Sequence, residues 1–63
     1  MYKLRTEQLH IAAGTELYDA TVYDYELAAY DTEMTNVKHM SVSSSEDGDY
    51  PVFSIPQREL EKV

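Results

Sequence analysis

Two strand-like segments around an Asp-Gly pair constrain the fold of this chain more than any other feature of its sequence. The segments are Val37–Ser44 and Tyr50–Ile55, and both are rich in residues that favour strands. Asp47 and Gly48 lie between them, and Asp-Gly is a strong signal for a tight hairpin turn. We therefore predict a β-hairpin over about residues 37–55.

The register of this hairpin follows from the position of the turn. A two-residue turn at Asp-Gly pairs Met40 with Ile55 and Val42 with Phe53, so that all four side chains point to one face. The other face carries Ser41, Ser43, Val52 and Ser54. We expect the apolar face to pack in the core and the serine-rich face to meet water.

Residues 16–34 are predicted to form the main helix, because apolar side chains recur along them at intervals of three and four. Thr15 can cap the start of this helix and Asn36 can end it. A strand over Ala20–Tyr25 is the alternative, since Thr, Val and Tyr also favour strands. The apolar stripe consists of Ala20, Tyr23, Leu27, Tyr30 and Met34.

Both ends of the chain add smaller elements. Tyr2–Arg5 can form a third strand, or Thr6 can cap a short helix that Gly14 ends. At the other end, Pro56 suits the first turn of a short helix that runs through Lys62. Leu60 would then fold back onto the hairpin.

These elements predict a single small acidic domain over residues 1–63 with an α+β fold. The main helix packs across the apolar face of a small antiparallel sheet built around the hairpin, and a short C-terminal helix comes after it. A core of this size contributes only roughly 3–5 kcal/mol. The chain has no cysteine, so no disulfide can add to that stability.

Negative charge is concentrated in the middle of the chain. Twelve acidic and five basic residues give a formal net charge of −7, and no base lies between Arg5 and Lys38. Such a surface repels nucleic-acid phosphates and anionic membranes, so we expect the protein to bind neither directly. A basic surface on another protein is the favoured partner, because long-range attraction speeds that encounter.

On the predicted helix the acids form two rows beside the apolar stripe. If the stripe takes the a and d positions of a heptad, Asp19, Glu26 and Glu33 take g, and Asp24 and Asp31 take e. Charges at e and g decide which partner can dock along such a stripe. Two parallel copies would set acid against acid, whereas a basic partner would be accepted.

A second line of side chains, Tyr18, Val22, Tyr25 and Ala29, follows the far side of the predicted helix. Either the N-terminal segment covers this line, or a partner does, and a second copy in a homodimer is one such partner. A further acidic group surrounds the hairpin turn. The predicted partner-binding residues are thus Asp19, Asp24, Glu26, Asp31, Glu33, Tyr18, Tyr25, Glu46, Asp47 and Asp49.

The sequence contains no pattern that indicates catalysis, a metal site or a cofactor. Glu7 and His10 have a spacing used by metal-binding helices, but the chain is too short to supply the remaining ligands. Asp47-Gly48-Asp49 is too short for a calcium loop. We therefore expect no enzyme, no catalytic residues, no metal and no cofactor. Neither a secretory signal nor a membrane span is apparent, so we expect a cytoplasmic protein.

The spacing of charge on the predicted helix suggests a function. Six carboxylates over about 26 Å give one charge per ~4 Å, close to the ~3.4 Å of a single DNA strand. In composition the chain is similar to small acidic inhibitors from phages and mobile elements, including anti-restriction and anti-CRISPR proteins, although no residue motif identifies such a family. We predict an inhibitor that occupies a basic, nucleic-acid-binding surface of a target protein. The alternative is a small structural or regulatory subunit that associates through the tyrosine-rich helix face.

Overall fold

The computed structural model describes residues 1–21 and 24–63, with the backbone alone for residues 24–26. Within these residues it contains one α-helix and a five-stranded antiparallel sheet, so the predicted α+β class is confirmed. The elements in chain order are β1 (Tyr2–Leu4), β2 (Glu16–Asp19), α1 (Asp24–Thr35), β3 (His39–Ser43), β4 (Val52–Pro56), the 3₁₀ turn η1 (Gln57–Glu59) and β5 (Leu60–Lys62).

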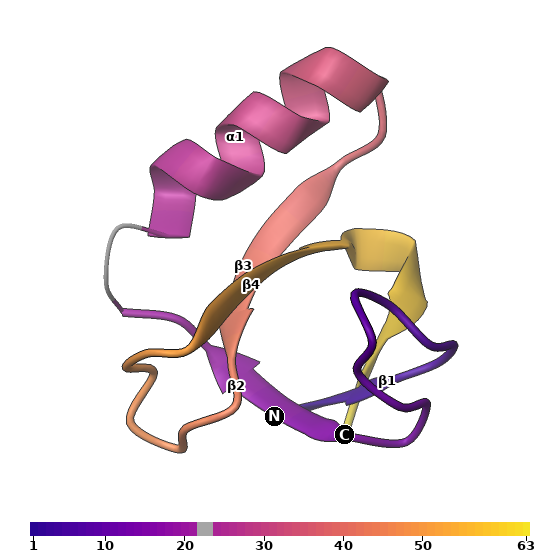
Figure 1. Ribbon diagram of the computed structural model, residues 1–63, viewed down its shortest axis with the longest axis vertical. Helices are drawn as coiled ribbons and strands as arrows, with labels where there is room; N and C mark the ends of the chain where they lie inside the picture. The colour runs from indigo at the N-terminus through magenta and orange to yellow at the C-terminus, as the bar shows by residue number, and fades with distance from the viewer. Residues whose placement is uncertain (22–23) are drawn as a thin grey trace.

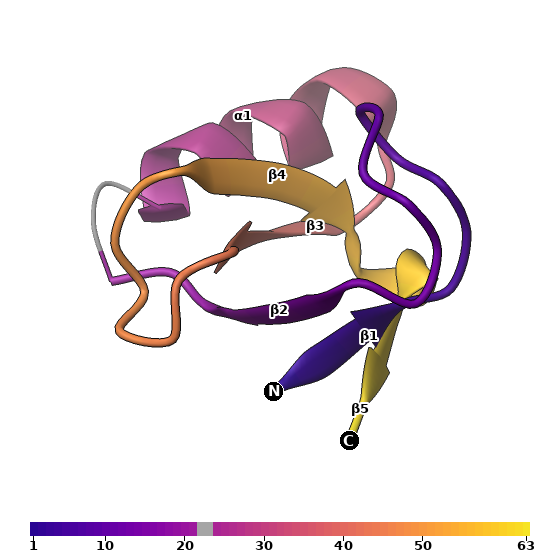
Figure 2. The same cartoon turned by 60° about the horizontal axis from the view of Figure 1, so that its bottom comes forward.

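The strand order is β4-β3-β2-β1-β5, so the last strand returns to pair with the first. The turn η1 carries the chain from one edge of the sheet to the other. Figure 2 shows β1 and β5 turned steeply away from the plane of β2, β3 and β4, with α1 on the opposite side of β3 and β4. The sheet is therefore strongly curled, and its concave side encloses the core.

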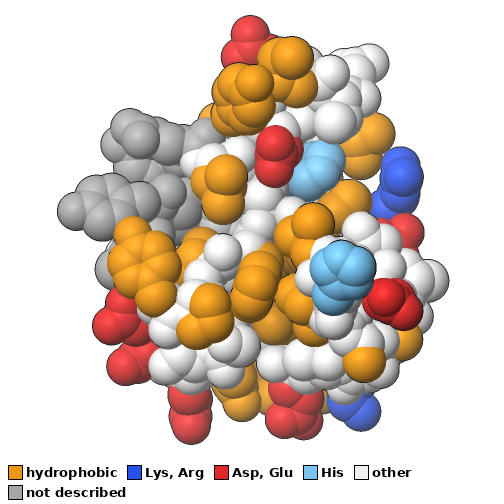
Figure 3. Space-filling view, in the orientation of Figure 1, with side chains coloured by type: hydrophobic (Ala, Val, Ile, Leu, Met, Phe, Trp, Pro, Cys, Tyr) orange, Lys and Arg blue, Asp and Glu red, His pale blue; other side chains and the backbone are white. Residues whose placement is uncertain are grey.

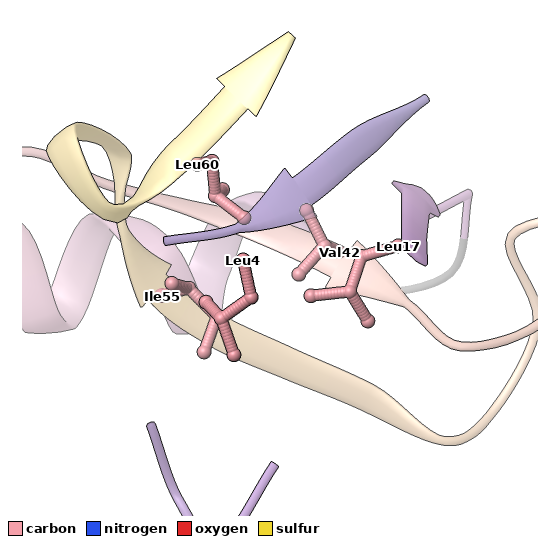
Figure 4. Packing of buried hydrophobic residues seen from close by; sticks show 5 residues of the cluster. All are labelled: Leu4, Leu17, Val42, Ile55 and Leu60. Atoms are coloured by element: carbon pink, nitrogen blue, oxygen red, sulfur yellow. The ribbon is translucent and has the colours of Figure 1, made fainter. Parts of the chain in front are cut away.

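Each of the five strands contributes one side chain to that core. The side chains point toward one another in Figure 4 and are almost fully buried: Leu4, Leu17, Val42, Ile55 and Leu60. Tyr2, Ile11, Met40 and Phe53 pack around them. The predicted register is confirmed, because Met40 pairs with Ile55 and Val42 with Phe53. Leu60 folds back onto the hairpin, as expected.

The helix lies on the other face of the hairpin, which corrects the prediction. Ser41 and Ser43, expected to meet water, are 7% and 0% exposed. Helix α1 covers this side of β3 and β4 (Figures 1 and 2), and Ala28 is its buried contact. The Thr32 hydroxyl accepts the His39 N–H at 2.8 Å and ties the helix to β3. None of the described helix side chains belongs to the core cluster.

The helix is also shorter than predicted. Residues 16–19 form β2, with Tyr18 opposite Ser43 and Asp19 opposite Val42. Burying Leu17 in the core requires an extended chain there, since alternation puts it on one face and Tyr18 on the other. Thr15 consequently precedes a strand instead of capping a helix. The alternative of a strand over Ala20–Tyr25 is also wrong, because α1 begins at Asp24.

Two further details of the helix prediction have separate outcomes. Asn36 ends the helix as expected, with a left-handed backbone at φ 58° and its N–H donated to Thr32 O at 2.9 Å. The predicted roles of Val22 and Tyr23 lie outside the described residues.

The connection between β3 and β4 is wider than the predicted two-residue turn. The strands end at Ser43 and Val52, and within the loop 44–51 the Gly48 N–H donates to Ser45 O at 3.0 Å. The tight turn is therefore centred on Glu46 and Asp47. The predicted register is nevertheless observed, because the loop 44–51 and the predicted two-residue turn are both centred between Asp47 and Gly48.

The ends of the chain pair with each other. Residues Tyr2–Leu4 form a strand, which confirms the predicted third strand at the N-terminus. The alternative of a short helix capped by Thr6 is wrong. The predicted C-terminal helix is wrong beyond its first turn, because β5 pairs with β1 and places Leu60 opposite Leu4. Burial of that leucine and the backbone hydrogen bonds of β1 favour an extended chain over a helix.

Candidate partner-binding surface

The predicted binding residues lie in three separate places. Tyr18 and Asp19 are in β2, Asp31 and Glu33 are in the second half of α1, and the remaining described acids are in the loop 44–51. Tyr18 is half-buried on a strand, so it shares no helix face with Tyr25 and the proposed tyrosine line is interrupted. The side chains of Asp24, Tyr25 and Glu26 lie outside the described part of the chain.

The fold brings one group of acids together from distant parts of the sequence. Loop 44–51 packs against the end of β2, where the Thr21 N–H donates to Gly48 O at 2.9 Å (Figure 1). A Cβ added at Gly48, whose φ is +82°, would lie 2.5 Å from Asp19 O, so the approach requires glycine. This places four exposed acids at one end of the molecule, here named the acidic end: Asp19, Glu46, Asp47 and Asp49.

Hydrogen bonds organise the loop side of the acidic end. Asp47 Oδ1 accepts the Ser45 hydroxyl at 2.6 Å and the Asp49 N–H at 3.0 Å. These bonds, the Ser45 bond first, lower the pKa of Asp47 from its ordinary value, so the side chain stays ionised. Asp49 Oδ1 accepts the N–H of Tyr50 at 2.8 Å. The two carboxylates are thus held in place by hydrogen bonds within the chain itself.

Asp19 is held from the other side by Tyr2 on the neighbouring strand. Burial raises the pKa of the Tyr2 hydroxyl, and the charge of Asp19 and a hydrogen bond to it raise it further. Tyr2 therefore remains a protonated donor that positions the Asp19 carboxylate. This contact is invisible in the sequence, because it depends on the pairing of β1 with β2.

The apolar stripe of the helix faces solvent, which reverses its predicted role in the core. Leu27, Tyr30 and Met34 are 42%, 62% and 66% exposed. We name these three residues the helix stripe. Figure 3 shows hydrophobic side chains beside acidic ones over the part of the surface formed by α1. Glu33 is exposed and Asp31 is half-buried next to this stripe.

The acids of both regions are not neutralised by bases of the same chain. Among the described residues the single ion pair joins Arg58 Nε to Glu59 Oε2 at 3.7 Å. Lys3 is in β1, Arg5 follows that strand and Lys62 is in β5, and Figure 2 shows these two strands turned away from α1. Charge is therefore uneven on the molecule: the described acids of the loop and the helix lack a paired base, while the paired termini hold most of the bases together with acids such as Glu16 and Glu61, which lie opposite Lys3.

No group of three or more His, Asp or Glu side chains is arranged to hold a metal ion in the part of the chain that is described. The His39 ring nitrogen Nδ1 lies 2.7 Å from Val37 O, and His10 is exposed on the loop before β2. Across residues 1–21 and 24–63, no helix has the length and apolar character needed to cross a membrane.

Comparison with known proteins identifies no relative: no protein-family model, no curated protein and no solved structure matches the chain. The function of the protein must therefore be inferred from the geometry and charge of its own surface.

Proposed function

We propose that this protein is a non-enzymatic binding protein whose acidic surface occupies a basic surface of another protein. The uneven distribution of charge carries the proposal. The described acids at the loop and on the helix lie outside ion-pair distance of the chain's own bases. Unpaired surface carboxylates make the electrostatic potential at the surface more negative. They attract a positively charged partner over about a Debye length, ~10 Å at 0.1 M salt.

A nucleic-acid-binding groove is the basic surface that this charge pattern fits best. Four acids between Asp24 and Glu33 of α1 span about 14 Å, or one charge per ~3.5 Å, compared with ~3.4 Å along a DNA strand. The helix therefore imitates a shorter stretch of strand than the predicted 16–34 helix would have done. The acidic end adds four more carboxylates outside the helix. By this account the protein inhibits its target by excluding nucleic acid from the groove.

The test is affinity capture of basic proteins, with two baits that carry the same change in charge. One bait is Asp19→Asn with Glu46→Gln, which removes two charges at the acidic end. The matched control is Glu7→Gln with Glu61→Gln, which removes two exposed charges elsewhere. We expect the native protein and the control to retain a common partner that salt and duplex DNA release. The acidic-end variant should retain about tenfold less of it at equal salt.

Two results would contradict the proposal. The retained partner could be acidic or neutral, or its binding could be unchanged between low and high salt. Equal loss with both baits would support a contribution of net charge alone and would remove the acidic end from the proposed contact.

A further inference from the structure

We infer that the helix stripe docks a basic amphipathic helix of the partner protein. This inference rests on the proposed function and assigns one surface to it. The stripe has the geometry of a helix-packing seam, because its residues are spaced by three and four and span about 10 Å along α1. The acidic end would then add electrostatic attraction beside an apolar contact.

The orientation of α1 is the first observation that points to a docking surface. A surface helix normally turns its apolar side chains to the core and its polar side chains to water. Here Ala28 and Thr32 face the sheet, while Leu27, Tyr30 and Met34 are exposed. Three of the large exposed apolar side chains thus lie in one line on one element. Clustered exposure of this kind marks interaction sites, whereas single exposed residues do not.

The charges around the stripe decide the chemistry of the partner. At 100° per residue, Glu33 and Asp31 fall on opposite sides of the stripe. The helix contains four acids and no base. No basic side chain in its last turn therefore offsets the negative end of the helix dipole. Lys38 follows the helix but pairs with no carboxylate in the described residues. Lysines or arginines flanking an apolar seam on the partner would compensate all of these charges.

A second copy of the chain is a poorer occupant. Packing two helix stripes together would bring the same carboxylates face to face, because each copy carries acids on both sides of the seam. Like charges set against each other weaken association.

Two synthetic peptides of equal charge test the inference directly. Both contain about 18 Leu and Lys residues, ~27 Å as a helix; in one the leucines form a single face and in the other the order is scrambled. By fluorescence anisotropy we expect the native protein to bind the amphipathic peptide about tenfold more tightly than the scrambled one. The variant Leu27→Ser with Met34→Ser should bind both equally.

The control variant is Val63→Ser, which removes another exposed apolar side chain far from the helix in sequence. It should keep the native preference, and circular dichroism should show all variants folded, since the changed positions are exposed. Glu33→Lys should weaken binding of both peptides by about fivefold, because it reverses a charge beside the seam.

The outcomes separate the two proposals. Equal binding of both peptides by the native protein would overturn the docking stripe and leave the charge-based function standing. Binding of neither peptide would also overturn the docking stripe, while the charge-based function is decided by the affinity capture with the acidic-end variant. Concentration-dependent dimerisation in sedimentation experiments, abolished by Leu27→Ser with Met34→Ser, would assign the stripe to a second copy and overturn the inference.

Discussion

The two faces of the β3–β4 pair are built on different principles. One face carries Met40, Val42, Phe53 and Ile55 and is enclosed by the sheet itself, through β1, β2 and β5. The other face carries serines and is covered by the helix. Both faces are buried, but only the first is held by apolar packing among strands. The second is held by small side chains and by hydrogen bonds such as the one that the His39 N–H donates to the Thr32 hydroxyl.

This difference explains why the described part of the helix presents Leu27, Tyr30 and Met34 to solvent. Ala28 faces a surface of serines, and small residues on both sides let a helix approach a sheet closely. The curled sheet encloses the apolar face, so the helix stripe of Leu27, Tyr30 and Met34 lies outside the core that the strands form.

Neighbouring residues of β4 provide the strongest test of this contrast. Ile55 is fully buried in the core, and Ile55→Ala should cost about 2–5 kcal/mol. This equals most of the stability expected for so small a core, so the variant should be largely unfolded. Chemical denaturation followed by circular dichroism measures the change.

The matched substitution on the opposite face is Ser54→Ala. The Ser54 hydroxyl oxygen is buried and has no hydrogen-bond partner within the described chain. Removing it should leave stability unchanged or raise it by up to about 1 kcal/mol. A loss as large as that of Ile55→Ala would show that the serine face contributes as much as the core and would end the contrast.

A pair of glycines tests how closely the loop 44–51 must approach the end of β2. Both have left-handed backbones, at φ +88° for Gly14 and +82° for Gly48, so an alanine at either costs about 1–2 kcal/mol. A Cβ at Gly14 meets nothing within 4 Å, but at Gly48 it meets Asp19 O at 2.5 Å. Gly48→Ala should therefore destabilise the protein more than Gly14→Ala in urea denaturation. Equal losses of stability would mean that loop 44–51 moves away from Asp19 without a further loss in the free energy of unfolding.

The sequence determines the hairpin well because its signals are local. The alternating apolar residues and the centre of the connection predict the register, and the observed pairing of Val42 with Phe53 confirms it, although the loop 44–51 replaces the predicted two-residue turn. The start of the helix could not be predicted in the same way. Ala20 and Leu27 fit one helical period, yet Ala20 precedes the helix, because burial of Leu17 in the core makes residues 16–19 a strand.

The candidate site was predictable only in its composition. The acids near the hairpin turn were apparent in the sequence, but their approach to Asp19 depends on the packing of loop 44–51 against β2. Which face of the hairpin the helix covers is likewise a tertiary property. A serine face looks solvent-exposed by its polarity, and nothing local indicates that Ala28 and Thr32 will cover it.

A smaller effect tests the hydrogen bond that ties the helix to the serine face. Thr32→Val keeps the shape of the side chain but leaves the His39 N–H without its acceptor, at a cost of about 1 kcal/mol. Amide hydrogen exchange at His39 should accelerate together with the loss of stability. Thr35→Val is the control, because the bonds of its hydroxyl to Asp31 O, Val37 O and the Val37 N–H are exposed and local. Similar effects from both would contradict a specific role for Thr32.

The smallest expected effect concerns the loop at the edge of the serine face, where the Ser43 hydroxyl donates to Asp49 O. The pKa of Asp47 is lowered in the folded protein, chiefly by the Ser45 hydroxyl and then by the Asp49 N–H. The contribution to stability is therefore complete above the ordinary value of 3.8 and is lost as the pH falls through the folded-state pKa. Ser45→Ala should raise the pKa of Asp47 toward that ordinary value.

Carbon-detected NMR titration of the Asp47 carboxyl group measures this shift directly. Ser44→Ala changes an exposed neighbour in the same loop and should leave the titration of Asp47 as it is. If Ser45→Ala also leaves it unchanged, the Ser45 hydroxyl does not organise the loop. The acidic end would then be a set of independent surface charges. The contrast between an apolar face held by packing and a serine face held by hydrogen bonds would then not extend to the loop 44–51 at the edge of the serine face.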